Sequence, residues 1–192
     1  MSKELLQPVR MESQFVDTKL QSVIFQAANV DTEVVDGTIA VLGGFAKDPV
    51  MTAAAVRNNA GASDVLDINT RTAKAAAAAD TGVGVIDIAG VPMAGDYRMG
   101  SKTTGLKANA GVPVRFRKLV EDDVFVIGEG NTTAALTVGK WAKVSDGKWA
   151  PEDTEDTAKA TNCYCLVVDK YKLTEGTTAD MFAYRLLVKK SV

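Results

Sequence analysis

The chain of 192 residues contains no histidine. Histidine is the side chain whose ordinary pKa lies nearest neutrality, and it supplies the base in Ser-His-Asp and Cys-His catalysis. Those mechanisms, histidine-ligated metals and imidazole proton transfer are therefore excluded. Only carboxylates, lysines and lone nucleophiles remain for catalysis. We predict a protein that is not an enzyme, with no catalytic residues, no cofactor and no metal site.

Three further features are missing from the sequence. No apolar run approaches the ~18 residues of a membrane span, and residues 1–8 lack the apolar stretch of a signal peptide. The net charge is -2, and no basic cluster exceeds residues 115–118. A nucleic-acid-binding protein needs a sustained basic surface to release counterions. We expect a protein made in the cytosol and soluble there, without a membrane or nucleic-acid partner, and with residues 115–118 on a solvated strand face.

Cysteine and aromatic residues are also scarce: the chain has two cysteines, and aromatics are 6% of the sequence. Cys163 and Cys165 lie two positions apart, so on a strand they face the same side and are poorly placed to form a disulfide. Two thiolates without other ligands do not form a zinc site. We therefore predict that both cysteines are small buried apolar residues.

The pattern that is present is that of short strands. Apolar residues alternate with Pro113 and two arginines from Val112 to Arg117, and residues 163–168 form a continuous apolar run. In a last strand, residues 182, 184, 186 and 188 alternate with Met181, Ala183, Arg185 and Leu187. Asp36-Gly37 and Asp146-Gly147 are hairpin turn signals next to apolar segments. Further strands are expected at residues 38–42, 64–68, 83–88, 124–127 and 135–144. This spacing predicts a mainly β fold, an antiparallel β-sandwich or barrel-like domain.

The remaining segments are less regular. Residues 51–60 and the alanine-rich residues 72–79 favour short helices, because alanine has the highest helix propensity. Leu20, Val23, Ile24 and Ala27 fit one helical stripe, and an extended segment fits equally well. We assign residues 1–29 to an extended N-terminal arm and residues 30–192 to a β-rich domain. A subdivision of that domain near residues 105–111 stays open.

Several motifs fall short of a functional site. Residues 95–103 approach a phosphate-binding loop, but Ser101 separates Gly100 from Lys102. The acidic residues at 122–123 and 152–156 lack the spacing of a calcium loop and are expected in solvated turns. Asn131-Thr132-Thr133 is formally a glycosylation sequon, and we expect it to be accidental. Trp141 and Trp149 flank the Asp146-Gly147 turn, where they can be core residues, subunit contacts or a sugar-binding platform.

The order of several segments carries a resemblance to a family. They are residues 34–42, 64–67, 85–92, 110–117, 122–127, 138–144, 165–168 and 184–188. In this order the chain resembles the capsid decoration (cement) proteins of tailed bacteriophages over most of residues 30–192. The resemblance rests on the pattern of segments and not on a diagnostic motif.

The resemblance implies a structural virion protein on the capsid exterior. Such a protein binds the major capsid protein between capsomers, often as a trimer, and reinforces the shell. No catalytic residue is implied. Two alternatives remain open: a tail, neck or fibre structural protein, and a carbohydrate-binding module that uses Trp141 or Trp149.

Overall fold

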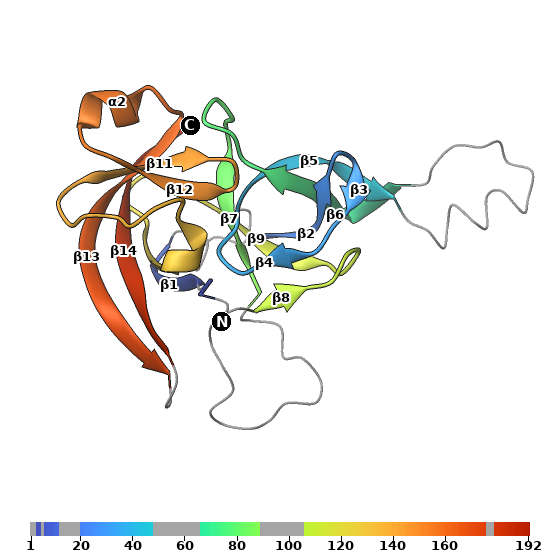
Figure 1. Cartoon of the computed structure of the whole chain (residues 1–192). Coiled ribbons are helices and arrows are strands. Elements are labelled where there is room, and N and C mark those ends of the chain that lie inside the picture. Colours follow the sequence, from blue (N-terminus) through green and yellow to red (C-terminus); the bar gives the residue numbers. More distant parts are fainter. Residues whose placement is uncertain (1–2, 5, 12–19, 48–65, 89–105, 176–178) are drawn as a thin grey trace, which may run out of the picture.

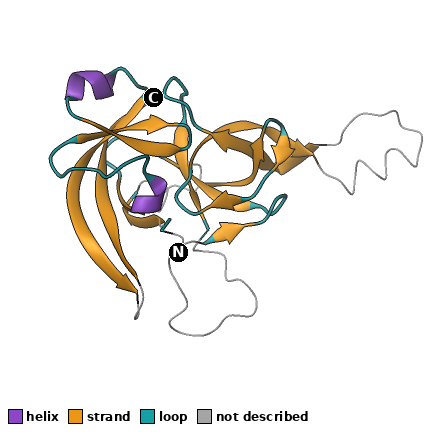
Figure 2. Cartoon of the chain, viewed as in Figure 1, coloured by secondary structure: helices purple, strands orange, loops and turns teal. Residues whose placement is uncertain are grey.

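The computed structural model describes residues 3–4, 6–11, 20–47, 66–88, 106–175 and 179–192. It is mainly β, which confirms the predicted fold class (Figures 1 and 2). Two larger sheets and one short strand pair contain the described strands. The only helical segments described are η3 (Glu129–Asn131) and α2 (Glu155–Lys159). Helix α2 begins with two of the acidic residues that were expected in a solvated turn. The predicted helix at residues 51–60 lies outside the described residues.

The first sheet, here called the open sheet, has six strands in the order β1-β10-β14-β13-β11-β12, and every neighbouring pair is antiparallel. Its strands are β1 (Leu6–Arg10), β10 (Val124–Gly128), β14 (Ala179–Ser191), β13 (Cys163–Glu175), β11 (Trp141–Ser145) and β12 (Lys148–Glu152). Both edge strands contain a proline, Pro8 on β1 and Pro151 on β12. Proline cannot donate a ladder hydrogen bond, which disfavours the addition of a further strand at an edge.

The second sheet closes into a small barrel, because β2 pairs with β6 on one side and with β9 on the other. The barrel strands run in the order β2 (Leu20–Ala27), β6 (Leu66–Ala75), β5 (Ile39–Lys47), β7 (Val83–Asp87) and β9 (Val114–Lys118). The short strand β3 (Val30–Asp31) pairs with the end of β2, and β4 (Val34–Val35) pairs with β8 (Lys107–Ala108). The β2–β6 pair is parallel, unlike the other barrel pairs. A parallel pair requires a long crossover connection, and the chain from β3 to β5 supplies it.

Two expectations about local structure were wrong. Residues 20–27 form a barrel strand and not a helical stripe or a peripheral arm, with Val23 and Phe25 in the barrel core. Residues 66–75 form β6, and the alanines that follow it form no helix. In both segments, pairing with neighbouring strands outweighs the weak local preference for a helix.

Strands β5 and β7 join the barrel to the open sheet. On β5, Ala40 belongs to the barrel core, while Ile39 belongs to a larger core that lies between the barrel and the open sheet. On β7, Ile86 points into the barrel, while Val83 and Val85 contact the same larger core. Side chains alternate between the two faces of a strand, so these strands are buried on both sides. The two sheets therefore share one continuous apolar contact.

The β11–β12 hairpin adds a backbone connection between the sheets. Its turn residues Asp146 and Gly147 have φ angles of 46° and 74°, as in a type I′ turn. Gly147 donates its N–H to the Ala76 carbonyl at 3.0 Å and accepts the Ile39 N–H at 2.9 Å. A Cβ at Gly147 would lie 3.1 Å from the Ala75 Cβ, so glycine fits both the turn and this contact. The predicted hairpin turn at Asp146-Gly147 is thus confirmed, and the turn is hydrogen-bonded to the barrel strand β5 and to Ala76.

Candidate interaction surface

The described residues contain no group of three or more Cys, Asp or Glu side chains that could hold a metal ion. No helix in this part of the chain is long and apolar enough to cross a membrane. The phosphate-loop near match at residues 95–103 lies outside the described residues. The Asn131 side chain of the sequon is 2% exposed and donates to the Asp36 carbonyl at 2.8 Å, so it is inaccessible in the folded chain.

The acidic residues noted in the sequence act in turns and ion pairs, and the expectation of a solvated turn was wrong for Asp123, which is 4% exposed. Asp122 adopts a left-handed φ of 69°, and the Asp123 carboxylate accepts the Val120 N–H at 2.9 Å. Glu152 pairs with Lys143, which lowers the pKa of Glu152 through a hydrogen bond from the lysine. Glu155 pairs with Lys159 one helical turn later, at 3.3 Å. These contacts explain the carboxylates as local stabilising groups.

The two tryptophans have different environments. Trp149 is fully buried in the larger core, with its ring centroid 6.0 Å from that of Phe125. Trp141 is partly exposed, and its ring meets Tyr164 edge-on at 5.7 Å. A sugar-binding platform needs an exposed ring face. Trp149 therefore cannot serve as one in this fold, and Trp141 is already in contact with a neighbouring ring.

Both cysteines are free and fully buried in the larger core, which confirms the sequence interpretation. Burial raises the pKa of the Cys163 thiol to about 12, and it raises the pKa of Cys165 well above its usual value. A thiol in an unfolded chain ionises near pH 8.5. Above that pH unfolding releases protons, so the free energy of unfolding should fall by up to about 1.4 kcal/mol per pH unit for each thiol, until the pH reaches the folded pKa.

Urea unfolding measured at pH 8 and pH 10 tests this expectation. The wild-type chain should lose more stability between the two pH values than the variant Cys163→Ala/Cys165→Ala, which shares every other titrating group. An equal loss in both proteins would show that the thiols are not buried as described.

Two buried carboxylates were not identified from the sequence. Asp36 is fully buried, and its two carboxylate oxygens accept the N–H groups of Leu6 and Ile88, each at 2.8 Å. Asp87 is 2% exposed and lies 2.6 Å from Nε of Arg117 and 3.3 Å from Nη2 of Arg115. The prediction of a solvated basic strand face was therefore wrong for Arg117, which is buried with Asp87. Strand β7 pairs with β9 at this point, and the sequence alone does not show that pairing.

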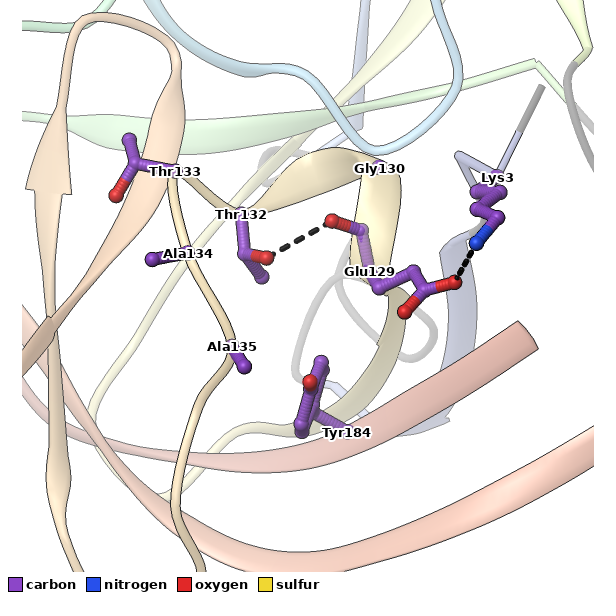
Figure 3. Close-up of a pocket in the computed structure, with 8 residues that line it drawn as sticks. All are labelled: Lys3, Glu129, Gly130, Thr132, Thr133, Ala134, Ala135 and Tyr184. Atoms are coloured by element: carbon purple, nitrogen blue, oxygen red, sulfur yellow. Dashed lines mark hydrogen bonds and ion pairs between the residues drawn. The ribbon is translucent and has the colours of Figure 1, made fainter.

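A shallow pocket of about 290 Å³ lies beside η3, lined by Lys3, Glu129, Gly130, Thr132, Thr133, Ala134, Ala135 and Tyr184 (Figure 3). Its charged pair, Lys3 and Glu129, and the Thr132 hydroxyl are already engaged within the chain. The Glu129 carboxylate is turned toward Lys3 and forms an ion pair with it, while the Thr132 hydroxyl donates to the Glu129 carbonyl at 2.8 Å. A ligand site needs a few convergent polar groups that are free to bind. The Lys3, Glu129 and Thr132 groups are not free in this way, because they bind one another within the chain.

The most prominent surface feature is a pair of two-stranded ribbons that extend beyond the sheets. The first, here called the β13–β14 ribbon, comprises residues 172–175 and 179–182, which pair with each other beyond the reach of β10 and β11 (Figure 1). Phe182 on it is 40% exposed, and the Lys170 ammonium lies 4.2 Å from its ring centroid. This cation–π contact covers one aromatic face with a charge.

The second, here called the β5–β6 ribbon, comprises residues 45–47 and 66–69. Ala46 pairs with Asp67 and Lys47 with Leu66 beyond the reach of β7 and β2, while Phe45 pairs with Arg71 just before them. Phe45, Leu66 and Ile68 are exposed on it, with Ile68 77% exposed. The Arg71 guanidinium lies 5.8 Å from the Phe45 ring centroid and donates to the Gly43 carbonyl. Each ribbon thus presents at least one exposed aromatic side chain next to a cation from the same chain.

No protein-family model, curated protein sequence or solved structure matches the chain.

Proposed function

We propose that the chain is a structural virion protein that binds the outer surface of a tailed-phage capsid and stabilises the shell by bridging capsomers. The observation that carries the proposal is the pair of ribbons with exposed apolar side chains, held by one shared core. Exposed apolar patches on a folded chain are typical of protein-binding surfaces. The resemblance to decoration proteins supplies the partner class, the major capsid protein, and favours a trimer.

A repetitive capsid lattice suits two modest binding surfaces on one rigid body. When one ribbon is bound, the second meets its site at a high effective concentration, so two weak contacts combine into strong binding. A rigid scaffold limits the conformational entropy that is lost on association. The protein would accordingly need no single deep site, and its place would be the virion exterior after synthesis in the bacterial cytoplasm.

Co-sedimentation with purified phage heads that lack the protein tests this function. We expect saturable binding at hundreds of copies per head. Tens of copies or fewer would favour the alternative of a tail or neck protein, and no binding would contradict the proposal.

Charged substitutions on the ribbons should weaken head binding. Ile68→Asp and Phe182→Asp would each place a carboxylate in an apolar contact, and burying an unpaired charge is unfavourable. We expect each variant to bind heads at least about tenfold more weakly, which corresponds to ~1.4 kcal/mol. Val138→Asp is the matched control, because Val138 is 49% exposed and lies outside both ribbons. Equal binding by all three variants would mean that the ribbons do not contact the capsid.

A further inference from the structure

The N-terminal segment occupies a slot at the edge of the open sheet. Strand β1 pairs with β10 alone, from Leu6 opposite Ile127 to Arg10 opposite Val124. Leu6 and Met11, at the two ends of this segment, are 2% and 0% exposed and belong to the larger core. The slot therefore holds an extended chain with apolar anchors five positions apart.

The inner wall of the slot recognises main-chain atoms. The Asp36 carboxylate accepts the Leu6 N–H at 2.8 Å, and the Gly130 N–H donates to the Lys3 carbonyl at 3.0 Å. A Cβ on Gly130 would lie 2.7 Å from the carbonyl carbon of Lys3, so the absence of a side chain there lets the segment approach. An empty slot would leave the buried Asp36 carboxylate without one of its donors, which is unfavourable. The slot therefore favours occupation by an extended strand.

The attachment of β1 is nevertheless interrupted along its length. Pro8 has no N–H to donate, and the register shifts between Pro8 and Arg10. A shift of this kind disrupts the ladder locally. The slot is thus well formed at its ends, while the strand that fills it is weakly paired in between.

We propose that the slot is a strand-acceptor site, and that residues 3–11 of a second copy of this chain occupy it by exchange. The second copy is the occupant because its segment carries the same anchors and the same main-chain donors as the one already seated. Exchange of an identical element between protomers is a low-cost route to a dimer. The eight residues between Met11 and Leu20 can span up to about 30 Å, which allows β1 to reach an adjacent copy. This inference holds whatever the ribbons bind.

Disulfide trapping between two single-cysteine variants tests the exchange. Arg10 and Val124 are register partners across β1 and β10, and neither is buried. An Arg10→Cys chain mixed with a Val124→Cys chain can form this crosslink only when β1 of one copy lies on β10 of the other, because a disulfide needs Cα atoms about 4.4–6.8 Å apart. The native cysteines are buried and protonated, so they do not compete.

We expect the mixed disulfide on a non-reducing gel at a yield about tenfold above that of Arg10→Cys mixed with Val138→Cys, which reports random collisions at a distant exposed site. Equal yields in the two mixtures would overturn the proposal. The double variant Arg10→Cys/Val124→Cys should form this disulfide within one chain where β1 lies in its own slot and between two chains where β1 is exchanged; the absence of both products would also overturn the proposal, because β1 would not lie on β10. The assay contains no capsid, so its outcome is separate from that of the head-binding experiment.

Discussion

Replacing Trp149 with alanine is expected to lower the free energy of unfolding by about 3–5 kcal/mol. Trp149 is the largest of the fully buried side chains, and it packs near Phe125 between the open sheet and the barrel. Its removal leaves a cavity in the one core that both sheets share, and surrounding side chains fill such a cavity only in part. Urea unfolding followed by far-ultraviolet circular dichroism measures the change.

Trp141→Ala is the matched control for this prediction. Trp141 is on the adjacent strand and is partly exposed, so its loss removes less buried area and one edge-on ring contact with Tyr164. We expect less than half the destabilisation of Trp149→Ala. Equal effects of the two substitutions would contradict the assignment of Trp149 to the core.

Replacing Asp87 with alanine is expected to destabilise the chain by about 3–5 kcal/mol, because it removes the carboxylate that neutralises a buried guanidinium. The Arg117 side chain is 10% exposed, and its Nε lies 2.6 Å from the Asp87 carboxylate. Removing one partner of a buried ion pair leaves a charge in a poorly solvated site, which costs more than the pair itself contributes. Chemical denaturation at pH 7 gives the magnitude.

Asp169→Ala supplies the comparison at the protein surface. Asp169 and Arg185 form an exposed ion pair at 3.8 Å. Exposed pairs contribute about 0–1 kcal/mol, since water and salt screen them. If Asp87→Ala were no more destabilising than Asp169→Ala, the Asp87–Arg117 pair would not be buried in the folded protein.

The strands of this fold were predictable where the local pattern is strong. Alternation predicted β9 and the later part of β14, the apolar run predicted β13, and Asp146-Gly147 predicted the tight hairpin. Each of these signals depends on residues close together in sequence. The side-chain period and the turn residues are enough to specify them.

The features that the sequence did not predict depend on contacts between distant residues. The closure of the barrel requires β2 to pair with β6 and with β9, and no local pattern encodes that choice. The buried position of Arg117 depends on Asp87, thirty residues earlier. The role of Asp36 depends on Leu6 and Ile88, which approach it only in the folded chain.

From the sequence we could predict the class of site, a protein-binding surface, but not the residues that form it. The absence of histidine led us to expect a protein that is not an enzyme, and the resemblance to decoration proteins led us to expect a protein-binding surface. The β13–β14 ribbon arises because β13 and β14 are each 13 residues long, whereas β10 and β11 are each 5 residues long. The β5–β6 ribbon arises likewise, because β5 and β6 have 9 and 10 residues and their neighbours β7 and β2 have 5 and 8. A long strand extends past its shorter neighbours only in the register that the folded sheet adopts. The exposed positions of Ile68 and Phe182 follow from that alignment.

The length of the β13–β14 pairing also bears on mechanical strength. Backbone pairing runs from Cys163 opposite Ser191 to Glu175 opposite Ala179. Inter-strand hydrogen bonds lie perpendicular to the strands, so tension applied along the ribbon is resisted by many of them in parallel rather than one after another. A force that displaces β13 along β14 would thus be carried in shear over the whole length of this pairing, in the centre of the open sheet.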